Sequence, residues 1–317
     1  MVKLDDYLKD VKTVAISGHI HPDGDCVGST VGFYNYIVEN YPEVKADLYL
    51  EDSYSDTFSF LENIDCIQSE YPEKASYDLF VSLDCSDIER LGEAKKYFQE
   101  AKDTICLDHH ISNKGFASHN YIYPDKSSAC EVLFEMLDEN KISKEIAECI
   151  YLGLVHDTGV FQYSCTSART MEIAGMMMEK QIDYSEIVQK TFFAKTYAQN
   201  KIMAHAILQS KLHEQGMIIS SIVSQADFEK YGVSSKDLDG IVNQLQITKG
   251  VEVAVFLYQN SDGGYKASLR SNGKVNVACV CEKFGGGGHV RASGVSMTGE
   301  ADEILDKLIE ELKKQLS

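Results

Sequence analysis

The sequence predicts an α/β protein with a parallel sheet in an N-terminal domain and a smaller α/β domain at the C-terminal end. Short apolar runs alternate with segments of helical periodicity over residues 11–154, a pattern typical of parallel strands joined by helices. A length of 317 residues favours two domains over one. We expect a first domain over 1–190, a helical connection over 191–205 and a second domain over 206–317, with the active site in the cleft between the domains.

The expected elements of the first domain follow from the position of apolar and β-branched residues. We expect strands over 11–16, 46–50, 78–83, 104–107 and 121–123. We expect helices over 27–38, 88–102, 126–139 and 144–154, the second of them a surface helix. In the second domain we expect strands over 216–223, 251–258 and 265–269, helices over 238–245 and 301–316, and a hairpin turn at 260–264.

Composition restricts the function. The net charge is −19, so long nucleic acid, whose affinity depends on many phosphate contacts, is an unsuitable ligand. No apolar run is long enough for a membrane span, and the charged N-terminus does not resemble a secretory signal. Nine cysteines at scattered positions indicate a reducing cytoplasm. The sequence leaves open whether the chain forms a homodimer.

Acidic and histidine side chains follow three of the expected strands. His19, His21, Asp23 and Asp25 lie in a Gly- and Pro-containing turn after the first strand. Single or grouped side chains follow two later strands and the helix that ends near residue 154: Asp84, then Asp108, His109 and His110, then Asp157. Parallel strands end at one edge of a sheet, so these groups are expected to converge into an active site. Imidazole beside carboxylates suits Mn, Fe or Zn. The alternative for any one of them is a helix cap.

These residues resemble the four motifs of the DHH phosphoesterases, a superfamily that includes family II pyrophosphatases, RecJ exonucleases and small nanoRNases. The matching residues are His19-x-x-x-Asp23-x-Asp25, Asp84, Asp108-His109-His110 and Asp157. Arg270-Ser271, Val275-Asn276-Val277 and Phe284 to His289 resemble the domain that accompanies DHH in nanoRNase/pAp-phosphatase proteins. His156, before Asp157, departs from the family pattern.

The resemblance implies two divalent ions, most simply Mn²⁺. One would be held by His19, Asp23 and Asp84, and the other by Asp25, Asp84, His109 and Asp157, so that Asp84 would bridge them. It also implies that His110 contacts the phosphate and serves as general acid, and that Asp108 fixes an imidazole. Asp84, Asp108 and His110 are therefore the expected catalytic residues.

The second domain carries the expected substrate-binding residues: Arg270, Ser271, Asn276, Gly286, Gly287, Gly288 and His289. Four consecutive glycines offer backbone N–H groups to a phosphate or base edge, and basic side chains surround them in the sequence. The alternative is a flexible glycine loop with ordinary surface charges. His21 is a further candidate for substrate contact, and a solvated loop histidine is the equal alternative.

The expected activity is hydrolysis of short RNA or dinucleotides such as pApA and pGpG to mononucleotides, with pAp as a second substrate. Cleavage of pApA would belong to cyclic-di-AMP turnover. An inorganic pyrophosphatase shares the metal motifs but does not need Arg270 and the glycine-rich loop. A non-catalytic nucleotide sensor is the other alternative, and the presence of every expected ligand argues against it.

Overall fold

The computed structural model describes residues 2–51, 54–73, 76–260 and 263–316. The chain divides into two compact units, Met1–Ala194 and Lys195–Ser317. Within the described part, no helix combines the length and the apolar character that crossing a bilayer requires.

The first unit is built on a parallel sheet, as predicted, and the described residues give it six strands where five were expected, β3 being the additional one. The strands are β1 (Thr13–Ser17), β2 (Lys45–Tyr49), β3 (Ile67–Gln68), β4 (Leu79–Leu83), β5 (Asp103–Asp108) and β6 (His119–Ile122). Their order is β3-β2-β1-β4-β5-β6, so the order reverses between the neighbours β1 and β4. In open α/β sheets, the crevice beyond the carboxyl ends of the strands at such a reversal is where ligands bind. The loops after β1 and β4 border this point.

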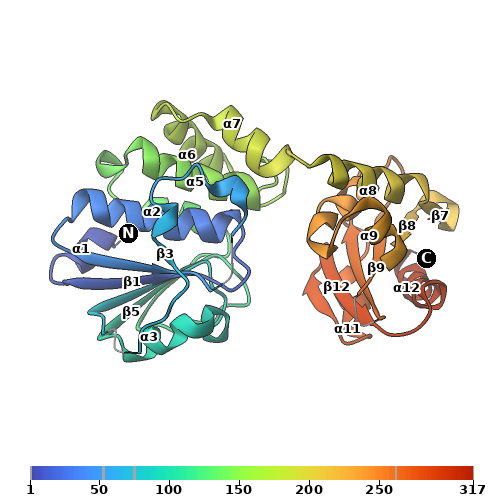
Figure 1. Ribbon diagram of the computed structural model, residues 1–317, viewed down its shortest axis with the longest axis horizontal. Coiled ribbons are helices and arrows are strands. Elements are labelled where there is room, and N and C mark those ends of the chain that lie inside the picture. The colour runs from blue at the N-terminus through green and yellow to red at the C-terminus, as the bar shows by residue number, and fades with distance from the viewer. Residues whose placement is uncertain (1, 52–53, 74–75, 261–262, 317) are drawn as a thin grey trace. The chain divides into compact units, whose positions relative to one another are not determined.

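Helices cover both faces of this sheet (Figure 1). The helices are α1 (Leu4–Leu8), α2 (Gly24–Asn40), α3 (Lys95–Glu100), α4 (Ala129–Met136), α5 (Lys144–Asp157), α6 (Ala168–Glu179) and α7 (Tyr184–Val188). α2 lies between the sheet and α5, and most of its residues are buried. Gly28 permits this close packing, since a Cβ there would lie 2.5 Å from the carbonyl oxygen of Cys149 in α5.

The expected surface helix over 88–102 is wrong in part. Residues Ile88–Ala94 form 3₁₀ turns interrupted by Gly92, whose φ of 56° no continuous helix accommodates. The helix begins only at Lys95, and Leu91 and Tyr97 are buried against the sheet. The acidic and lysine-rich composition indicates a surface helix but does not show that the backbone turns at Gly92.

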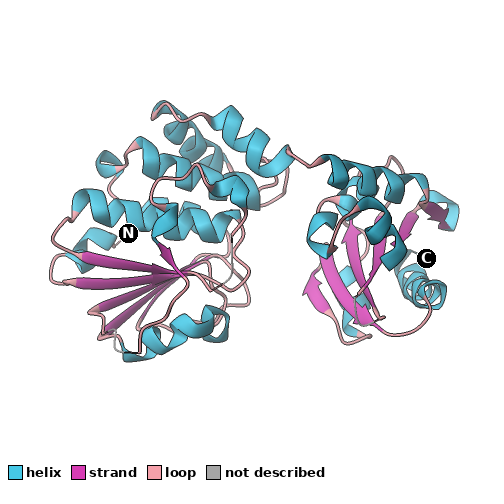
Figure 2. Ribbon diagram, in the orientation of Figure 1, coloured by secondary structure: helices cyan, strands magenta, loops and turns pink. Residues whose placement is uncertain are grey.

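The second unit contains its own six-stranded sheet, ordered β11-β12-β10-β9-β8-β7 (Figure 2). The strands are β7 (Lys211–His213), β8 (Ile218–Val223), β9 (Val253–Gln259), β10 (Tyr265–Ser271), β11 (Gly287–His289) and β12 (Ala292–Met297). Only β8 and β9 pair in parallel. The helices are α8 (Tyr197–Leu208), α9 (Gln225–Tyr231), α10 (Ile241–Gln246), α11 (Val277–Glu282) and α12 (Ala301–Leu316). The apolar residues of α11 and α12 share one buried cluster with the sheet, and those of α8, α9 and α10 share another.

Two links between elements were expected, a helical connection over 191–205 and a hairpin turn at 260–264. α8 supplies Ile202 and Ala206 to the core of the second unit, and a π-helical turn at Gln189–Phe193 precedes it. The expected hairpin turn at 260–264 includes residues 261–262, which lie outside the described part of the chain.

Candidate metal centre

Asp84 stands at the centre of the predicted site. It follows β4 directly, is 2% exposed and has a φ of 51°. One carboxylate oxygen, Oδ2, lies 3.3 Å from Nε2 of His19. The other, Oδ1, lies 3.6 Å from Nε2 of His109 and 3.5 Å from Nδ1 of His110. Left-handed backbone at a non-glycine residue is strained and gathers at functional sites, and here it turns one carboxylate toward two groups of imidazoles.

One group of donors lies on the His109 side. Nε2 of His109 is 3.0 Å from Oδ2 of Asp157, the last residue of α5, and 3.9 Å from Oδ2 of Asp25. Asp25 is completely buried, and its two oxygens accept hydrogen bonds from the first N–H groups of α4, those of Ala129 and Cys130, at 2.6 and 2.9 Å. The end of α4 therefore fixes the Asp25 carboxylate beside His109.

The other group lies on the His19 side. Nδ1 of His19 is bonded to the carbonyl oxygen of Ile20 at 2.7 Å, which leaves Nε2 toward Asp84. Oδ1 of Asp23 accepts the N–H groups of Asp25 and Cys26, both at 3.1 Å, and lies 3.9 Å from Nε2 of His19. Asp23 therefore caps α2 while its carboxylate remains in reach of the His19 group.

The ionisation of these groups reflects their crowding. Burial, with the charges of Asp157 and Asp84, raises the pKa of Asp25 well above its usual value, against its two N–H donors. Burial, with the charge of Asp84, raises the pKa of Asp157 to about 6. Burial alone would lower the pKa of His109, but Asp157 and Asp25 raise it to about 10. Crowded carboxylates thus raise one another's pKa values and that of the imidazole between them.

His110 is oriented by Asp108, so the imidazole that Asp108 was expected to fix is this one. Nδ1 of His110 donates to Oδ1 of Asp108 at 2.7 Å, and Nδ2 of Asn113 donates to Oδ2 of the same carboxylate at 2.7 Å. The hydrogen bond from Asp108 raises the pKa of His110, although burial opposes it. Nε2 of His110 is therefore the nitrogen left for a substrate.

These donors fit divalent cations. Ligand atoms of Asp25, His109 and Asp157 lie within 4.8 Å of one another, as do those of Asp84, His109 and His110, and those of His19, Cys26 and Asp84. Oδ1 of Asp84 is buried and has no hydrogen-bond partner among the described residues. A buried carboxylate oxygen without a donor is costly, and a cation would satisfy it. The expected ligands are thus brought together from four separate segments.

Three contributors were not expected from the sequence. Asn113 holds Asp108, the N-terminus of α4 holds Asp25, and Cys26 lies in the His19 group. Ser128 caps α4, and a serine at this position is a helix-start signal in the sequence. Nothing in the sequence indicated which carboxylate would bind the N-terminus of that helix. The ring of His156 packs over Gly24, where a Cβ would lie 2.2 Å from the ring. Glycine is therefore required between the two aspartates.

The predicted substrate residues of the second unit are only partly brought together. Arg270 in β10 pairs with Ala292 in β12, which pairs with His289 in β11, so Arg270 and His289 share one face of the sheet. Ser271 lies on the opposite face, where it is buried and donates to Glu252. Asn276 caps α11 by accepting the N–H of Cys279.

The glycine run is not the open loop that was expected. The N–H groups of Gly285 and Gly286 donate to the carbonyl oxygens of Glu282 and Cys281, and residues Gly287–His289 form the edge strand β11. A Cβ at Gly286 would lie 2.3 Å from the carbonyl oxygen of Gly294, so packing requires this glycine. A Cβ at Gly287 would meet nothing within 4 Å.

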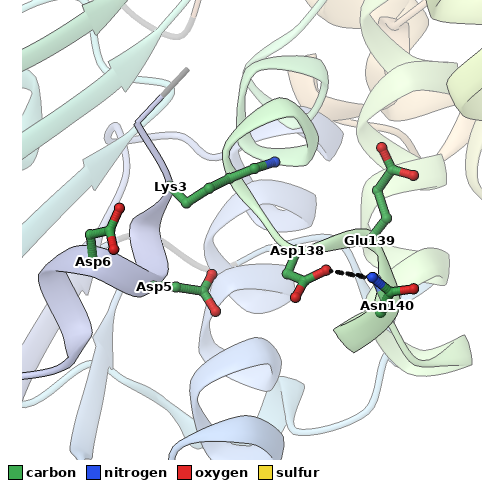
Figure 3. Close-up of a pocket in the computed structure, with 6 residues that line it drawn as sticks. All are labelled: Lys3, Asp5, Asp6, Asp138, Glu139 and Asn140. Atoms are coloured by element: carbon green, nitrogen blue, oxygen red, sulfur yellow. Dashed lines mark hydrogen bonds between the residues drawn. The ribbon is translucent and has the colours of Figure 1, made fainter.

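His21 and one polar pocket are two further features of the first unit. His21 is exposed, with a φ of 58°. One cavity has a volume of about 420 Å³. Figure 3 shows the side chains that line it, none of them a predicted site residue: Lys3, Asp5, Asp6, Asp138, Glu139 and Asn140. Asp5 accepts hydrogen bonds from Tyr36 and Lys141, and Lys3 caps carbonyl oxygens at the end of α4, so these charges support the fold.

The parallel sheet with His and Asp side chains gathered at its order reversal defines an α/β protein with a candidate two-ion centre. Residues 13–154 match the N-terminal domain of the DHH family and residues 214–317 match the DHHA1 domain. The chain therefore contains a DHH domain followed by a DHHA1 domain, and DHH phosphoesterases are metal-dependent.

The chain is similar to curated proteins over nearly its whole length. It is 27% identical to the probable bifunctional oligoribonuclease and PAP phosphatase NrnA of Streptococcus mutans, covering 98% of this chain and 96% of that protein. It is 28% identical to the bifunctional oligoribonuclease and PAP phosphatase NrnA of Bacillus subtilis, covering 93% of each. The solved structure of an exopolyphosphatase-related protein from Bacteroides fragilis has the same fold, with a TM-score of 0.89, 24% identity and coverage of 98% and 94%.

Proposed function

We propose that this protein is a two-ion phosphoesterase that hydrolyses short oligoribonucleotides, including pApA and pGpG, to mononucleotides, and pAp to AMP and phosphate. The observation that carries the proposal is the position of Asp84, whose two carboxylate oxygens face separate groups of imidazoles. The names of the relatives from Streptococcus mutans and Bacillus subtilis support the substrate class.

The ligands of the two ions follow from the two donor groups. His19, Asp23 and Asp84 would hold one ion, and Asp25, Asp84, His109 and Asp157 the other, with Mn²⁺ as the metal that serves turnover. When bound, such ions activate water and stabilise the charge that develops on a phosphoryl group. The α4 terminus orients the Asp25 carboxylate through two hydrogen bonds, and the carbonyl oxygen of Ile20 keeps the lone pair of His19 at Nε2.

His110 serves as the proton donor. Its Nδ1–H is held by Asp108, so a protonated ring presents Nε2–H to the leaving oxygen of the substrate. The hydrogen bond from Asp108 raises the pKa of this ring, which favours the charged form that also attracts the phosphate. Asp108 does not need to contact the substrate, because its carboxylate is fully buried between His110 and Asn113.

The second unit binds the nucleotide end of the substrate. Arg270 and His289 face the same side of the sheet, and Gly286, Gly287 and Gly288 lie along the edge strand and the turn before it. A guanidinium forms bidentate, charge-assisted hydrogen bonds with phosphate. Substrate roles for Ser271, Asn276 and His21 stay predictions.

The setting of the reaction is the reducing cytoplasm, supported by nine unpaired cysteines. Hydrolysis of pApA there would contribute to cyclic-di-AMP turnover. A homodimer stays a prediction.

A substrate panel tests the proposed function. Pyrophosphate, pAp, pApA, pGpG and RNAs of increasing length are incubated with the Mn²⁺-loaded protein, and products are separated by chromatography. Mononucleotides from the dinucleotides, with little phosphate released from pyrophosphate, support the proposal. Preferential cleavage of pyrophosphate would replace it with a pyrophosphatase, and tight nucleotide binding without any product would indicate a sensor.

A further inference from the structure

The sulfur atom of Cys26 lies on the His19 side of the candidate metal centre. It lies in the first turn of α2, its side chain is 0% exposed, and its Sγ lies 3.8 Å from the carbonyl oxygen of His19. Sγ, a ring nitrogen of His19 and a carboxylate oxygen of Asp84 all lie within 4.8 Å of one another. Three donors of different chemistry are therefore gathered from the end of β1, the start of α2 and the end of β4.

The surrounding chain holds the sulfur in this place. The N–H of Cys26 donates to Asp23, which fixes the first turn of α2. A Cβ at Gly18 would lie 2.3 Å from Sγ, so the sulfur can approach the His19 backbone only because residue 18 has no side chain. The position of Sγ is thus set by both segments that carry the neighbouring donors.

The two neighbours of the sulfur, Asp84 and His19, are both oriented as ligands of a cation would be. Asp84 is 2% exposed, and the carboxylate oxygen that it turns toward this group, Oδ2, lies 3.3 Å from Nε2 of His19. His19 also has the arrangement common in metal-binding histidines, since Nδ1 is occupied by a backbone carbonyl oxygen and Nε2 faces the site.

We propose that Cys26 is a sulfur ligand of the ion held by His19 and Asp84, and that it gives this position a preference for borderline-soft cations such as Zn²⁺, Co²⁺ or Cd²⁺ over Mn²⁺. Thiolate is a soft ligand that favours these ions, whereas the Asp25, His109 and Asp157 group offers only nitrogen and oxygen. Binding requires the thiol to lose its proton to solvent. This inference rests on the proposed two-ion centre and adds a ligand and a metal preference to it.

Cobalt substitution tests the ligand directly, because a thiolate bound to Co²⁺ gives a charge-transfer absorption band in the near ultraviolet. Metal-free protein is titrated with Co²⁺ while absorbance and bound cobalt are measured together. We expect wild type to show the band, and Cys26→Ala to lose it. Cys26→Ser keeps the volume of the side chain without sulfur, so it should also lose the band and guards against a folding defect in Cys26→Ala.

Cys130 provides the matched control. It is also 0% exposed, and its Sγ lies 3.8 Å from the carbonyl oxygen of Asp25, yet it belongs to no candidate metal group among the described residues. Cys130→Ala should keep the band. A His19→Ala variant shows how much absorbance comes from exposed thiols elsewhere, because it removes the neighbouring ligand and leaves every cysteine.

The outcomes separate this inference from the proposed function. Two bound Co²⁺ ions without the band, or an undiminished band in both Cys26 variants, would overturn the sulfur ligand and leave the two-ion centre intact. Failure of wild type to bind two ions would overturn both. Zn²⁺ also binds nitrogen and oxygen ligands more tightly than Mn²⁺ does, so the competition is read as a ratio: the Zn²⁺-to-Mn²⁺ affinity ratio at one ion position should be larger in wild type than in Cys26→Ala.

Discussion

Nε2 of His109 lies 3.0 Å from Oδ2 of Asp157, which joins the end of β5 to the end of α5. Without an ion, this contact is an ion pair that shares a proton, and with the pKa of His109 raised to about 10 the ring is charged at neutral pH. A metal can bind Nε2 only after that proton leaves. The relationship links metal affinity to pH.

Metal binding should therefore release protons. At pH 7 we expect protons to leave as His109 and Asp25, whose pKa values are both raised, become ligands, and affinity should fall as the pH is lowered, because protons then compete better. Calorimetric titration with Mn²⁺ in two buffers of different ionisation enthalpy measures the release. His119→Gln, which alters a histidine paired with Asp103 instead, should leave the release unchanged. Equal observed enthalpies in both buffers would contradict the assignment.

Replacement of Asp84 should remove both ions. Asp84→Asn preserves the shape of the side chain and tolerates the positive φ, so the protein should fold and unfold cooperatively. Turnover should be lost and metal binding reduced at both positions, measured by calorimetry beside a thermal melt. Asp103→Asn, at the start of β5 where the side chain is partly exposed, is the control and should retain activity. Near-normal turnover of Asp84→Asn in saturating Mn²⁺ would rule out a bridging role.

The Asp108–His110 pair predicts a shift in the pH dependence of kcat. A general acid works while protonated, so kcat should fall as the pH rises through the raised pKa of His110. Asp108→Asn removes the charge that raises this pKa, so the alkaline limb of the kcat profile should move to lower pH. His110→Ala should lower kcat by about 10²–10⁴-fold with metal affinity kept. An unmoved limb in Asp108→Asn, or loss of a bound ion in His110→Ala, would assign His110 to the metal instead.

Substrates of different length test whether the second unit binds the nucleotide end of the substrate. Arg270→Ala should raise KM for a dinucleotide much more than for bis(p-nitrophenyl) phosphate, because the small ester lacks a nucleotide end to bind. Lys283→Ala, which alters a surface lysine paired with Glu311, is the control. For wild type, kcat/KM should be highest for dinucleotides and fall for RNA of about twenty nucleotides, since the acidic surface gives long chains no phosphate contacts. Equal harm to both substrates would exclude nucleotide binding by Arg270.

Substitutions at Gly286 and Gly287 distinguish a role in packing from a role in ligand binding. Gly286→Ala should lower the free energy of unfolding by about 1–3 kcal/mol, because its Cβ would press on the carbonyl oxygen of Gly294. Gly287→Ala has open space around its Cβ, so stability should stay within about 0.5 kcal/mol. If a phosphate approaches the backbone at this strand, Gly287→Ala should still raise KM for dinucleotides. Chemical denaturation and kinetics on both variants measure the two effects separately.

The sequence alone predicted most strands of the first sheet and the candidate metal ligands that gather at its edge. Buried parallel strands are continuous apolar runs, so β1, β4 and β5 were visible, and the acids and histidines directly after them could be placed at one edge. This placement depends only on the direction of the strands, because the carboxyl ends of parallel strands lie at one edge of the sheet. It also anticipated Asp157, but only as a residue after a helix, without a reason for its direction.

Only the tertiary structure decided which atoms meet. The carboxylate of Asp108 could have held either neighbouring histidine, and the loop that brings Asn113 onto it fixed the choice as His110. From the sequence, the glycine run is expected to be an unpaired loop, and only the folded structure shows that Gly287–His289 pairs with β12. Likewise, Ser271 is adjacent to Arg270 in the sequence yet lies on the opposite face, because side chains alternate along a strand. Local sequence sets where a strand or turn occurs, whereas the partners of a buried polar atom come from segments distant along the chain, and the folded packing alone specifies them.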